Sequence, residues 1–390
     1  MSGPLTGIKV LDLSRVMAGP WSGQILADLG ADVIKVERPG GGDDTRAWGP
    51  PFLEPQNSGY YLSVNRGKRS VAVDLADPAG QAVIRALAAR SDILLENFKV
   101  DTLQRYGLDY DGLKQACPRL IYCSITGFGQ TGPRRAQPAY DFVIQALGGL
   151  MSITGTPDET PGGGPQKVGV PIVDIMTGMY ATVAVLAALE RRHQTGEGEH
   201  IDLAMLDVQA AFLANQGMNH LLTGKEPKRT GNRHPNIQPQ NVYRCRDGHI
   251  AIAVGNDGQF RALANVLGEP GLADDERFAT NGARVRNLPA LEAVIDAQLA
   301  QQDAGHWEAA LDSAGVPAGR INTVGQVFAE PQLIAREMLR ELPRDGRPSV
   351  PSVVSPMRFR NAPLRFERAP PDLGEHTDEI LRELGMETAE

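Results

Sequence analysis

The first half of the chain alternates short apolar runs with amphipathic stretches, and this alternation limits the possible folds more than any other feature. Residues 8–13 (IKVLDL) and 31–39 (ADVIKVERP) are typical of buried strands, and residues 21–30 between them are typical of a short helix. A strand, a helix and a second strand in this order form a crossover unit, and such units build parallel sheets.

Three further strand-type runs extend the pattern. They span residues 70–75, 92–98 and 120–129, with helical stretches between them. Residues 1–200 therefore predict a doubly wound α/β domain.

The composition changes after residue 223. Residues 224–240 are polar and loop-like, which indicates a domain boundary, and the later pair Asp247 and Gly248 predicts a β-hairpin. A Pro-rich extended stretch (347–359) and a closing helix (373–386) follow. We therefore divide the chain into a large domain at 1–223, a small domain at 224–330 and a C-terminal segment at 331–390.

Charge and cysteine content exclude several classes of protein. The chain has 39 Lys and Arg against 47 Asp and Glu, a formal net charge of −8, which argues against nucleic acid as the main partner. Three cysteines without close pairs argue against a disulfide framework. No apolar run looks long enough to span a bilayer, and no signal peptide is evident. We expect a cytoplasmic protein that has no membrane partner.

Familiar cofactor motifs do not fit this sequence. Glu37 ends the second predicted strand, where an acid would bind a ribose hydroxyl, but the first turn reads RVMAGP (15–20) and lacks the glycines of a dinucleotide fingerprint. There is no P-loop, no cluster of metal-ligand type and no G-x-S-x-G elbow. The sequence thus predicts neither a metal site nor a bound nicotinamide cofactor.

Basic residues gather at the ends of the predicted strands, and for most of them we expect a solvated face. The group consists of Arg38, Arg46, Arg66, Lys68, Arg69, Arg105, Arg134 and Arg135. Arg38 differs because it follows a buried strand, where open α/β sheets bind ligands, and a guanidinium suits a phosphate. Phe98 and Tyr106 are candidates to flank a planar base, although core packing would use them equally well.

One acid stands at the start of an Ala-rich helix. Asp174 lies between Val173 and Ile175 in the stretch KVGVPIVDIMTGMYATVAVLAALERR (167–192). Asp is a favoured N-cap, so position alone favours a capping role. A carboxylate at a helix N-terminus is also suited to covalent catalysis on an acyl donor. The two roles are compatible.

Longer segments resemble a known family over nearly the whole chain. They include GIKVLDLSRVMAGP, GADVIKVERPGGGDDTRAWGPPF, YYLSVNRGKRSVAVDL, YCSITGFGQTGP, AYDFVIQALGGLMSITG, VGVPIVDIMTGMYA and LGEHTDEILRELG. Together they resemble the class III CoA-transferases, the formyl-CoA transferase and carnitine CoA-transferase family. The segment GDDTRAWGPPF followed by YYLSVNR is most similar to the succinyl-CoA-dependent branch, which includes succinate–hydroxymethylglutarate (glutarate) CoA-transferases.

The resemblance implies a fold and a reaction. The fold is a Rossmann-like α/β large domain with a smaller α+β domain, in an interlocked homodimer whose C-terminal segment returns to the large domain. The reaction moves CoA from an acyl-CoA, expected to be succinyl-CoA, to a carboxylic acid, expected to be dicarboxylic. The CoA thioester is a substrate, and the chemistry needs no prosthetic group.

The resemblance also implies roles for particular residues. Asp174 falls on the nucleophile, which forms aspartyl anhydride and aspartyl-CoA intermediates. Positions that line the CoA site are Val16, Ala18, Arg38, Val73, Asn97, Phe98, Arg105 and Tyr106. Residues expected near the acyl group or the acceptor are Met17, Arg46, Tyr140, Asp141, Gly255 and Gly258. For Arg46 we expect either a bond to the distal carboxylate of the acceptor or a surface position capping a loop.

Departures from the family pattern reduce the number of candidate reactions. Met17 stands where formyl-CoA transferases have glutamine, the turn at 254–260 holds only two glycines, and Pro138 replaces a lysine that contacts CoA. These differences argue against formyl-CoA:oxalate transfer. A 2-methylacyl-CoA racemase would need a histidine at position 140, which is Tyr140 here. A non-enzymatic CoA-binding or scaffold protein would have no need of Asp174.

Overall fold

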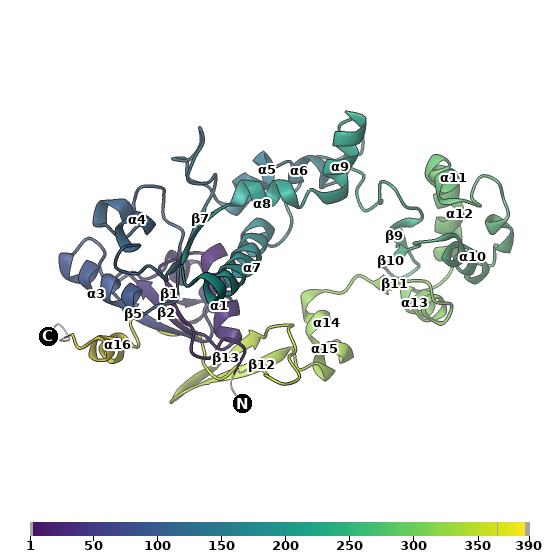
Figure 1. Cartoon of the computed structure of the whole chain (residues 1–390). Coiled ribbons are helices and arrows are strands. Elements are labelled where there is room, and N and C mark those ends of the chain that lie inside the picture. Colours follow the sequence, from purple (N-terminus) through teal and green to yellow (C-terminus); the bar gives the residue numbers. More distant parts are fainter. Residues whose placement is uncertain (1–2, 365, 387–390) are drawn as a thin grey trace. The chain divides into compact units, whose positions relative to one another are not determined.

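The computed structural model describes residues 3–364 and 366–386 (Figure 1). Residues 1–2, 365 and 387–390 lie outside the described residues. They belong to the start of the predicted large domain and to the predicted C-terminal segment. The chain divides into two compact units. The first unit comprises Met1–Met151, Lys167–Lys225 and Gln332–Glu390, and the second unit comprises Ser152–Gln166 and Glu226–Pro331.

A six-stranded parallel sheet forms the centre of the first unit. Its spatial order is β5-β2-β1-β6-β7-β8, and each neighbouring pair is parallel. The strands are β1 (Lys9–Asp12), β2 (Asp32–Glu37), β5 (Lys68–Ala72), β6 (Ile93–Glu96), β7 (Ile121–Thr126) and β8 (Glu199–Ala204). The chain winds to one side of β1 and then to the other, which is the doubly wound order predicted from the sequence. The switch point between β1 and β6 is where such sheets bind ligands.

Helices cover both faces of this sheet because the strands are apolar on both sides. Helix α3 (Pro78–Ala89) and helix α16 (Thr377–Leu384) share one core with Leu11 and Leu94, whereas α1 (Ala18–Asp28) shares the other with Val10. Helix α3 begins as the sequence predicts, since the Asp77 side chain accepts a hydrogen bond from Ala79 N and Pro78 occupies the first turn. The helix expected over 100–117 is instead two short turns, η2 (Leu103–Tyr106) and α4 (Tyr110–Leu113).

The longest helix, α7 (Ile172–Thr195), packs against α1 at a point of close approach. A Cβ on Gly178 would lie 2.6 Å from the backbone oxygen of Ala18, so only glycine fits there. By length and by a mean hydropathy of 1.9, α7 would qualify to cross a membrane. The expectation from the sequence that no apolar run could span a bilayer is therefore wrong when judged by the length and hydropathy of α7. Nevertheless, Ala181 and Val185 of α7 are fully buried in the core against the sheet.

Short elements complete the first unit. They are η1 (Asp44–Ala47), β3 (Phe52–Glu54), β4 (Asn57–Ser58), α2 (Gly59–Leu62), α5 (Asp141–Leu147), α8 (Met205–Ala211), α9 (Ala214–Thr223), β12 (Leu339–Arg344) and β13 (Arg347–Val353). Two further helices, α6 (Leu150–Ile153) and α15 (Pro331–Ala335), include residues of both units. Strands β12 and β13 pair as an antiparallel hairpin. The C-terminal helix α16 is pinned to β5, since Arg69 forms ion pairs with Glu379 and Glu383 at 2.9 and 2.8 Å.

The second unit has its own sheet and core. Strands β9 (Gln240–Arg244), β10 (His249–Ala253) and β11 (Ala318–Arg320) form an antiparallel sheet, and the β9–β10 hairpin turns at Asp247 and Gly248 as predicted. The helices are α10 (Asp257–Val266), η3 (Pro270–Ala273), α11 (Asn281–Arg286), α12 (Leu288–Leu299), α13 (Ala304–Ser313) and α14 (Val324–Phe328).

One segment groups differently from the prediction. Residues 152–166, expected in the large domain, belong to the second unit. Arg229 donates to the Ser152 carbonyl oxygen at 3.1 Å and pairs with Asp158, and Gly231 N donates to Gly155 O at 3.2 Å. These contacts join distant parts of the chain, so no local pattern announces them.

Candidate active site

Asp174 lies in the first turn of α7, but it does not cap the helix. The N-cap is Pro171, and Asp174 is the third helical residue. Its side chain is 9% exposed. The capping role that position alone favoured is therefore wrong, because Pro171 holds the N-cap position and no amide that the structure describes at the start of the helix donates to the Asp174 carboxylate.

The cap of α7 comes from another helix. Asp141, the first residue of α5, accepts hydrogen bonds on Oδ1 from Val173 N at 2.7 Å and from Asp174 N at 3.3 Å. Ile175 N donates to Pro171 O at 3.1 Å, so the first amides of the helix are satisfied. Asp141 is itself 8% exposed. The predicted active-site residue Asp141 thus contacts the backbone of Asp174 directly.

Burial and a like charge perturb the carboxyl group of Asp174, the nucleophile expected from the sequence. Removal from water and, to a lesser extent, the neighbouring charge of Asp141 together raise the pKa of Asp174 to about 7. Within the described residues, no group donates a hydrogen bond to the Asp174 carboxylate. A carboxyl group with a raised pKa gives a more basic carboxylate once it ionises. Without hydrogen-bond donors around it, this carboxylate is poorly solvated, and both properties suit a nucleophile.

Tyr60 lies within electrostatic reach of this pair and was not singled out from the sequence. Burial raises its pKa to about 12, and the charges of Asp174 and Asp141 contribute to the shift. The phenol therefore stays protonated at neutral pH and is available as a donor. Its ring meets that of Trp48 edge-on, with the centroids 5.2 Å apart. The sequence carries no local signal for this placement, because Tyr60 is more than a hundred residues from Asp174.

A separate pocket opens beyond the carboxyl ends of the central strands. It has a volume of about 210 Å³, and four of the eight residues predicted to line the CoA site line it, namely Arg38, Val73, Phe98 and Tyr106. The Arg15 guanidinium lies over the Phe98 ring at 5.2 Å. The Arg38 side chain is 62% exposed and makes one ion pair, with Asp44 at 3.2 Å. This is the switch point of the sheet, where a nucleotide is expected to bind.

The other four predicted CoA-site residues do not line this pocket. Val16 has a φ of 71°, a left-handed conformation that is rare for a β-branched residue, and its amide donates to the Asp43 carboxylate. Asn97 donates to Arg15 O at 2.7 Å and accepts from Arg15 N at 2.8 Å, so it shapes the same loop. Ala18 is buried at the start of α1, and Arg105 is exposed on η2.

A buried charge network underlies that loop. Lys35 donates to Asp43 Oδ2 and to Ser14 O, each at 2.9 Å, and Lys68 donates to Asp12 Oδ2 at 2.8 Å. Burial lowers the pKa of Lys68 to about 8 despite its carboxylate partner. These buried ion pairs and the bond to Ser14 O hold the loop after β1 in place.

The expectation of a solvated face is wrong for four basic residues, which are buried and paired. They are Arg46 with Glu37, Arg66 with Asp28, Lys68 with Asp12, and Arg69 with Asp32.

Arg46 is the clearest correction, because it neither faces an acceptor nor caps a surface loop. It is 2% exposed, and it forms a bidentate pair with Glu37 at 2.8 and 2.7 Å. Its remaining donors reach Asn57 Oδ1, the Tyr61 hydroxyl and Pro371 O. The side chain is therefore buried among partners of its own chain. Glu37, once considered for a ribose, is occupied by the same pair.

The remaining candidates are divided between the two units. Met17 is buried at the N-cap of α1, and Tyr140 is 60% exposed just before α5. In the second unit, Gly255 N donates to Gln259 Oε1 at 2.7 Å, and Gly258 lies in the first turn of α10. Their contact with substrate stays a prediction.

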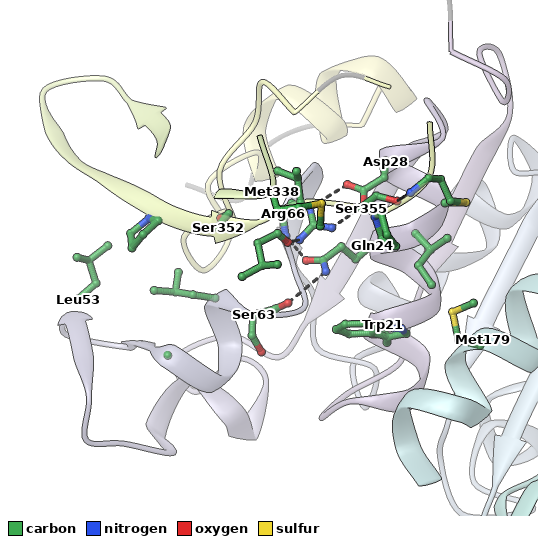
Figure 2. Close-up of a pocket in the computed structure, with 18 of the residues that line it drawn as sticks. Trp21, Gln24, Asp28, Leu53, Ser63, Arg66, Met179, Met338, Ser352 and Ser355 are labelled. Atoms are coloured by element: carbon green, nitrogen blue, oxygen red, sulfur yellow. Dashed lines mark hydrogen bonds and ion pairs between the residues drawn. The ribbon is translucent and has the colours of Figure 1, made fainter. Parts of the chain in front are cut away.

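A larger, mainly apolar pocket on the first unit has a volume of about 820 Å³. Figure 2 draws residues that line it. Trp21 and Met179 line its wall, together with Met338 and residues of β13. Some of its polar lining groups pair with one another or with the backbone, since Arg66 pairs with Asp28 and Gln24 donates to Ser63 O at 3.1 Å, whereas the buried Trp21 Nε1 has no partner among the described residues. None of the sequence-predicted site residues lines it.

Comparisons with known proteins agree on one family. The sequence model described as CoA-transferase family III matches residues 5–377. The chain is 50% identical over 386 residues to a succinate–glutarate CoA-transferase of Agrobacterium fabrum, covering 98% of this chain and 96% of that protein. It is 42% identical over 383 residues to the human succinyl-CoA:glutarate CoA-transferase, covering 98% and 86%. A crystal structure of a CAIB/BAIF family protein from Brucella suis superposes with a TM-score of 0.88 at 49% identity, covering 98% of this chain and 100% of that one.

Proposed function

The chain belongs to CoA-transferase family III, and we propose that it transfers CoA from succinyl-CoA to a dicarboxylic acid through covalent intermediates on Asp174. The observation that carries this proposal is the buried Asp174 carboxylate, which lacks hydrogen-bond donors and is held by Asp141 at the start of α7. Glutarate is the favoured acceptor, because two relatives are named as glutarate CoA-transferases.

The reaction follows from carboxylate chemistry. The Asp174 carboxylate attacks the thioester carbonyl of succinyl-CoA, the carbon–sulfur bond breaks, and a mixed anhydride and CoA thiolate form. The thiolate attacks the aspartyl carbonyl of the anhydride, which releases succinate and leaves aspartyl-CoA. The acceptor carboxylate attacks this thioester to give a second anhydride, and the thiolate then attacks the acceptor carbonyl. The products are the new acyl-CoA and the regenerated Asp174, with no net proton change.

The structure supplies groups for these steps. The Arg38 side chain is suited to a CoA phosphate, and Phe98 and Tyr106 are suited to flank the adenine. The Tyr60 phenol, protonated at neutral pH, is a candidate donor to the oxyanion that forms on the attacked carbonyl.

We also propose that the active form is a homodimer. The first unit exposes large apolar side chains on three helices, which are Phe142 and Leu147 on α5, Met179 and Val183 on α7, and Leu221 and Leu222 on α9. Apolar surface of this extent typically marks an interface. The second copy is the occupant that fits, because the family resemblance implies interlocked subunits.

The decisive experiment uses succinyl-CoA with glutarate. Wild-type protein is expected to form glutaryl-CoA, and hydroxylamine added with succinyl-CoA alone is expected to leave a hydroxamate at Asp174, detectable by peptide mass. Asp174→Asn is expected to fold and to lose transfer, because an amide cannot open a thioester. Turnover by that variant, with reversion to Asp excluded by mass, would refute the role of Asp174. Solvent deuterium at the α-carbon of a 2-methylacyl-CoA would instead indicate a racemase.

A further inference from the structure

A buried amide links the cap of α7 to the chain segment that precedes it. Gln145 lies one turn after Asp141 on α5 and is fully buried. Its Nε2 donates to Asp141 Oδ2 at 2.6 Å, and its Oε1 accepts from Val168 N at 2.9 Å. Residues four apart share one face of a helix, so α5 presents both side chains to the same neighbours.

The bond from Val168 N to Gln145 Oε1 is informative because of the path that the chain takes before it. Residues 152–166 belong to the second unit, and the chain rejoins the first unit at Lys167. The five residues from Lys167 to Pro171, here called the strap, then lead directly into α7. Gln145 holds the strap one residue after the chain rejoins, and Asp141 holds α7 at its far end.

We propose that Gln145 is a positioning residue for the transfer reaction: its amide fixes the Asp141 carboxylate and the strap together, and thereby sets the orientation of the Asp174 carboxylate. This inference rests on the proposed role of Asp174 as nucleophile. The Gln145 side chain bonds to Asp141 and Val168 and forms no hydrogen bond with Asp174, so it acts through Asp141.

The side-chain chemistry at position 145 follows from these two bonds. The site requires a donor toward a carboxylate and an acceptor toward a backbone N–H, and a neutral amide provides both. Without the donor, one oxygen of a buried carboxylate loses its partner, which is costly. Asp141 is then free to rotate away from the α7 amides. A displacement of about 1 Å at a reacting group can cost on the order of 100-fold in rate.

Two glutamine-to-methionine variants separate positioning from general stability. Gln145→Met keeps the shape of the side chain and removes both hydrogen bonds. Gln24→Met is the matched control, because Gln24 is also buried and also bridges two backbone groups, Ser63 O at 3.1 Å and Arg66 N at 3.1 Å. The two variants are expected to lose similar thermal stability. Only Gln145→Met is expected to lose turnover, by about 10- to 100-fold in kcat, with little change in KM for succinyl-CoA.

A third variant tests the donor directly. A protonated glutamic acid donates as the amide does, whereas an ionised one repels Asp141. Gln145→Glu is therefore expected to match the wild-type rate while the new carboxyl is protonated and to fall below the wild-type rate as pH rises and this carboxyl ionises, giving an alkaline limb that wild type lacks. The other charged or titratable groups that face Asp174 are Asp141 on α5 and Tyr60 on α2, and both are unchanged in this comparison.

The outcomes also distinguish failure of this inference from failure of the proposed function. Wild-type and Asp174→Asn proteins are assayed in parallel. Loss of transfer in Asp174→Asn together with unchanged kcat in Gln145→Met overturns the positioning role alone, as does an equal loss of kcat in Gln24→Met. No transfer by wild type, or transfer by Asp174→Asn, overturns the proposed function itself.

Discussion

At the scale of single residues, the proposed nucleophile Asp174 is buried where its ionised form is disfavoured. Attack on a thioester needs the ionised carboxylate of Asp174, yet burial raises its pKa to about 7 and Asp141 adds a like charge. Activity and stability therefore make opposite demands on this position, a conflict common at active sites. The conflict can be measured, because the pKa difference links stability to pH.

Asp174→Asn is expected to stabilise the fold at alkaline pH. The folded-state pKa of Asp174 lies above its ordinary value of 3.8, so ionisation favours the unfolded state. The contribution of this group to stability is complete below pH 3.8 and is lost as pH rises through about 7. At pH 8 the variant should exceed wild type by on the order of 1–4 kcal/mol in the free energy of unfolding, and the gain should shrink toward pH 5. Denaturant melts at both pH values, at one protein concentration, test this.

The exposed Asp312 provides the control for that measurement. Asp312→Asn should leave both melts within about 0.5 kcal/mol of wild type, as surface substitutions usually do. A difference between Asp174→Asn and wild type that is the same at pH 5 and pH 8 would contradict the assignment of the raised pKa.

Asp141→Asn is expected to move the acid limb of the pH–rate profile. In wild type, kcat/KM should rise through about pH 7 as Asp174 ionises, since this ratio reports the free enzyme. Removing the charge of Asp141 lowers the pKa of Asp174, so the limb should shift to lower pH. The maximal rate should also fall, because an asparagine cannot satisfy Gln145 and the α7 amides in the same geometry. A limb at an unchanged pH with a lower plateau would show that Asp141 acts through geometry alone.

At the scale of elements, the site depends on contacts between segments far apart in sequence, and this limits what the sequence could predict. The strands were predictable because both faces of the sheet are buried, which leaves continuous apolar runs such as IKVLDL. The cap of α7 was not predictable from the sequence, because it comes from Asp141, which precedes Asp174 by 33 residues. Arg46 was misplaced for the same reason: its partners include Pro371, which lies 325 residues further along.

Arg46→Met is expected to damage stability and to leave substrate choice unchanged. Removing one partner of a buried ion pair costs about 3–5 kcal/mol, because the other charge stays buried. Here the stranded group is Glu37, so adding Glu37→Gln should restore part of the loss. For any variant that folds, the ratio of glutarate to monocarboxylate turnover should equal that of wild type. A changed ratio would return Arg46 to the acceptor site.

At the scale of the whole molecule, the chain passes repeatedly between its two units. It leaves the first unit after residue 151, returns at 167, leaves again after 225 and returns at 332. The polar stretch at 224–240 signalled one of these crossings, whereas the loop at 152–166 gave no sign of belonging to the second unit. The first unit also carries apolar side chains that its own core does not use. These make the assembly state the property of the whole molecule most open to test.

A charge on the exposed face of α7 is expected to dissociate the protein into monomers. Val183 is 60% exposed, so in a monomer Val183→Glu would place a carboxylate in water and change stability by less than about 0.5 kcal/mol. In the proposed homodimer the same carboxylate would be buried without a partner, at a cost of several kcal/mol. Light scattering should therefore give a dimer for wild type and a monomer for Val183→Glu, with transfer activity lost in parallel. Ala309→Glu, at an exposed position of α13 in the second unit, is the control and should remain dimeric and active. If wild type is a monomer at assay concentration and still transfers CoA, the apolar face of α7 requires another explanation.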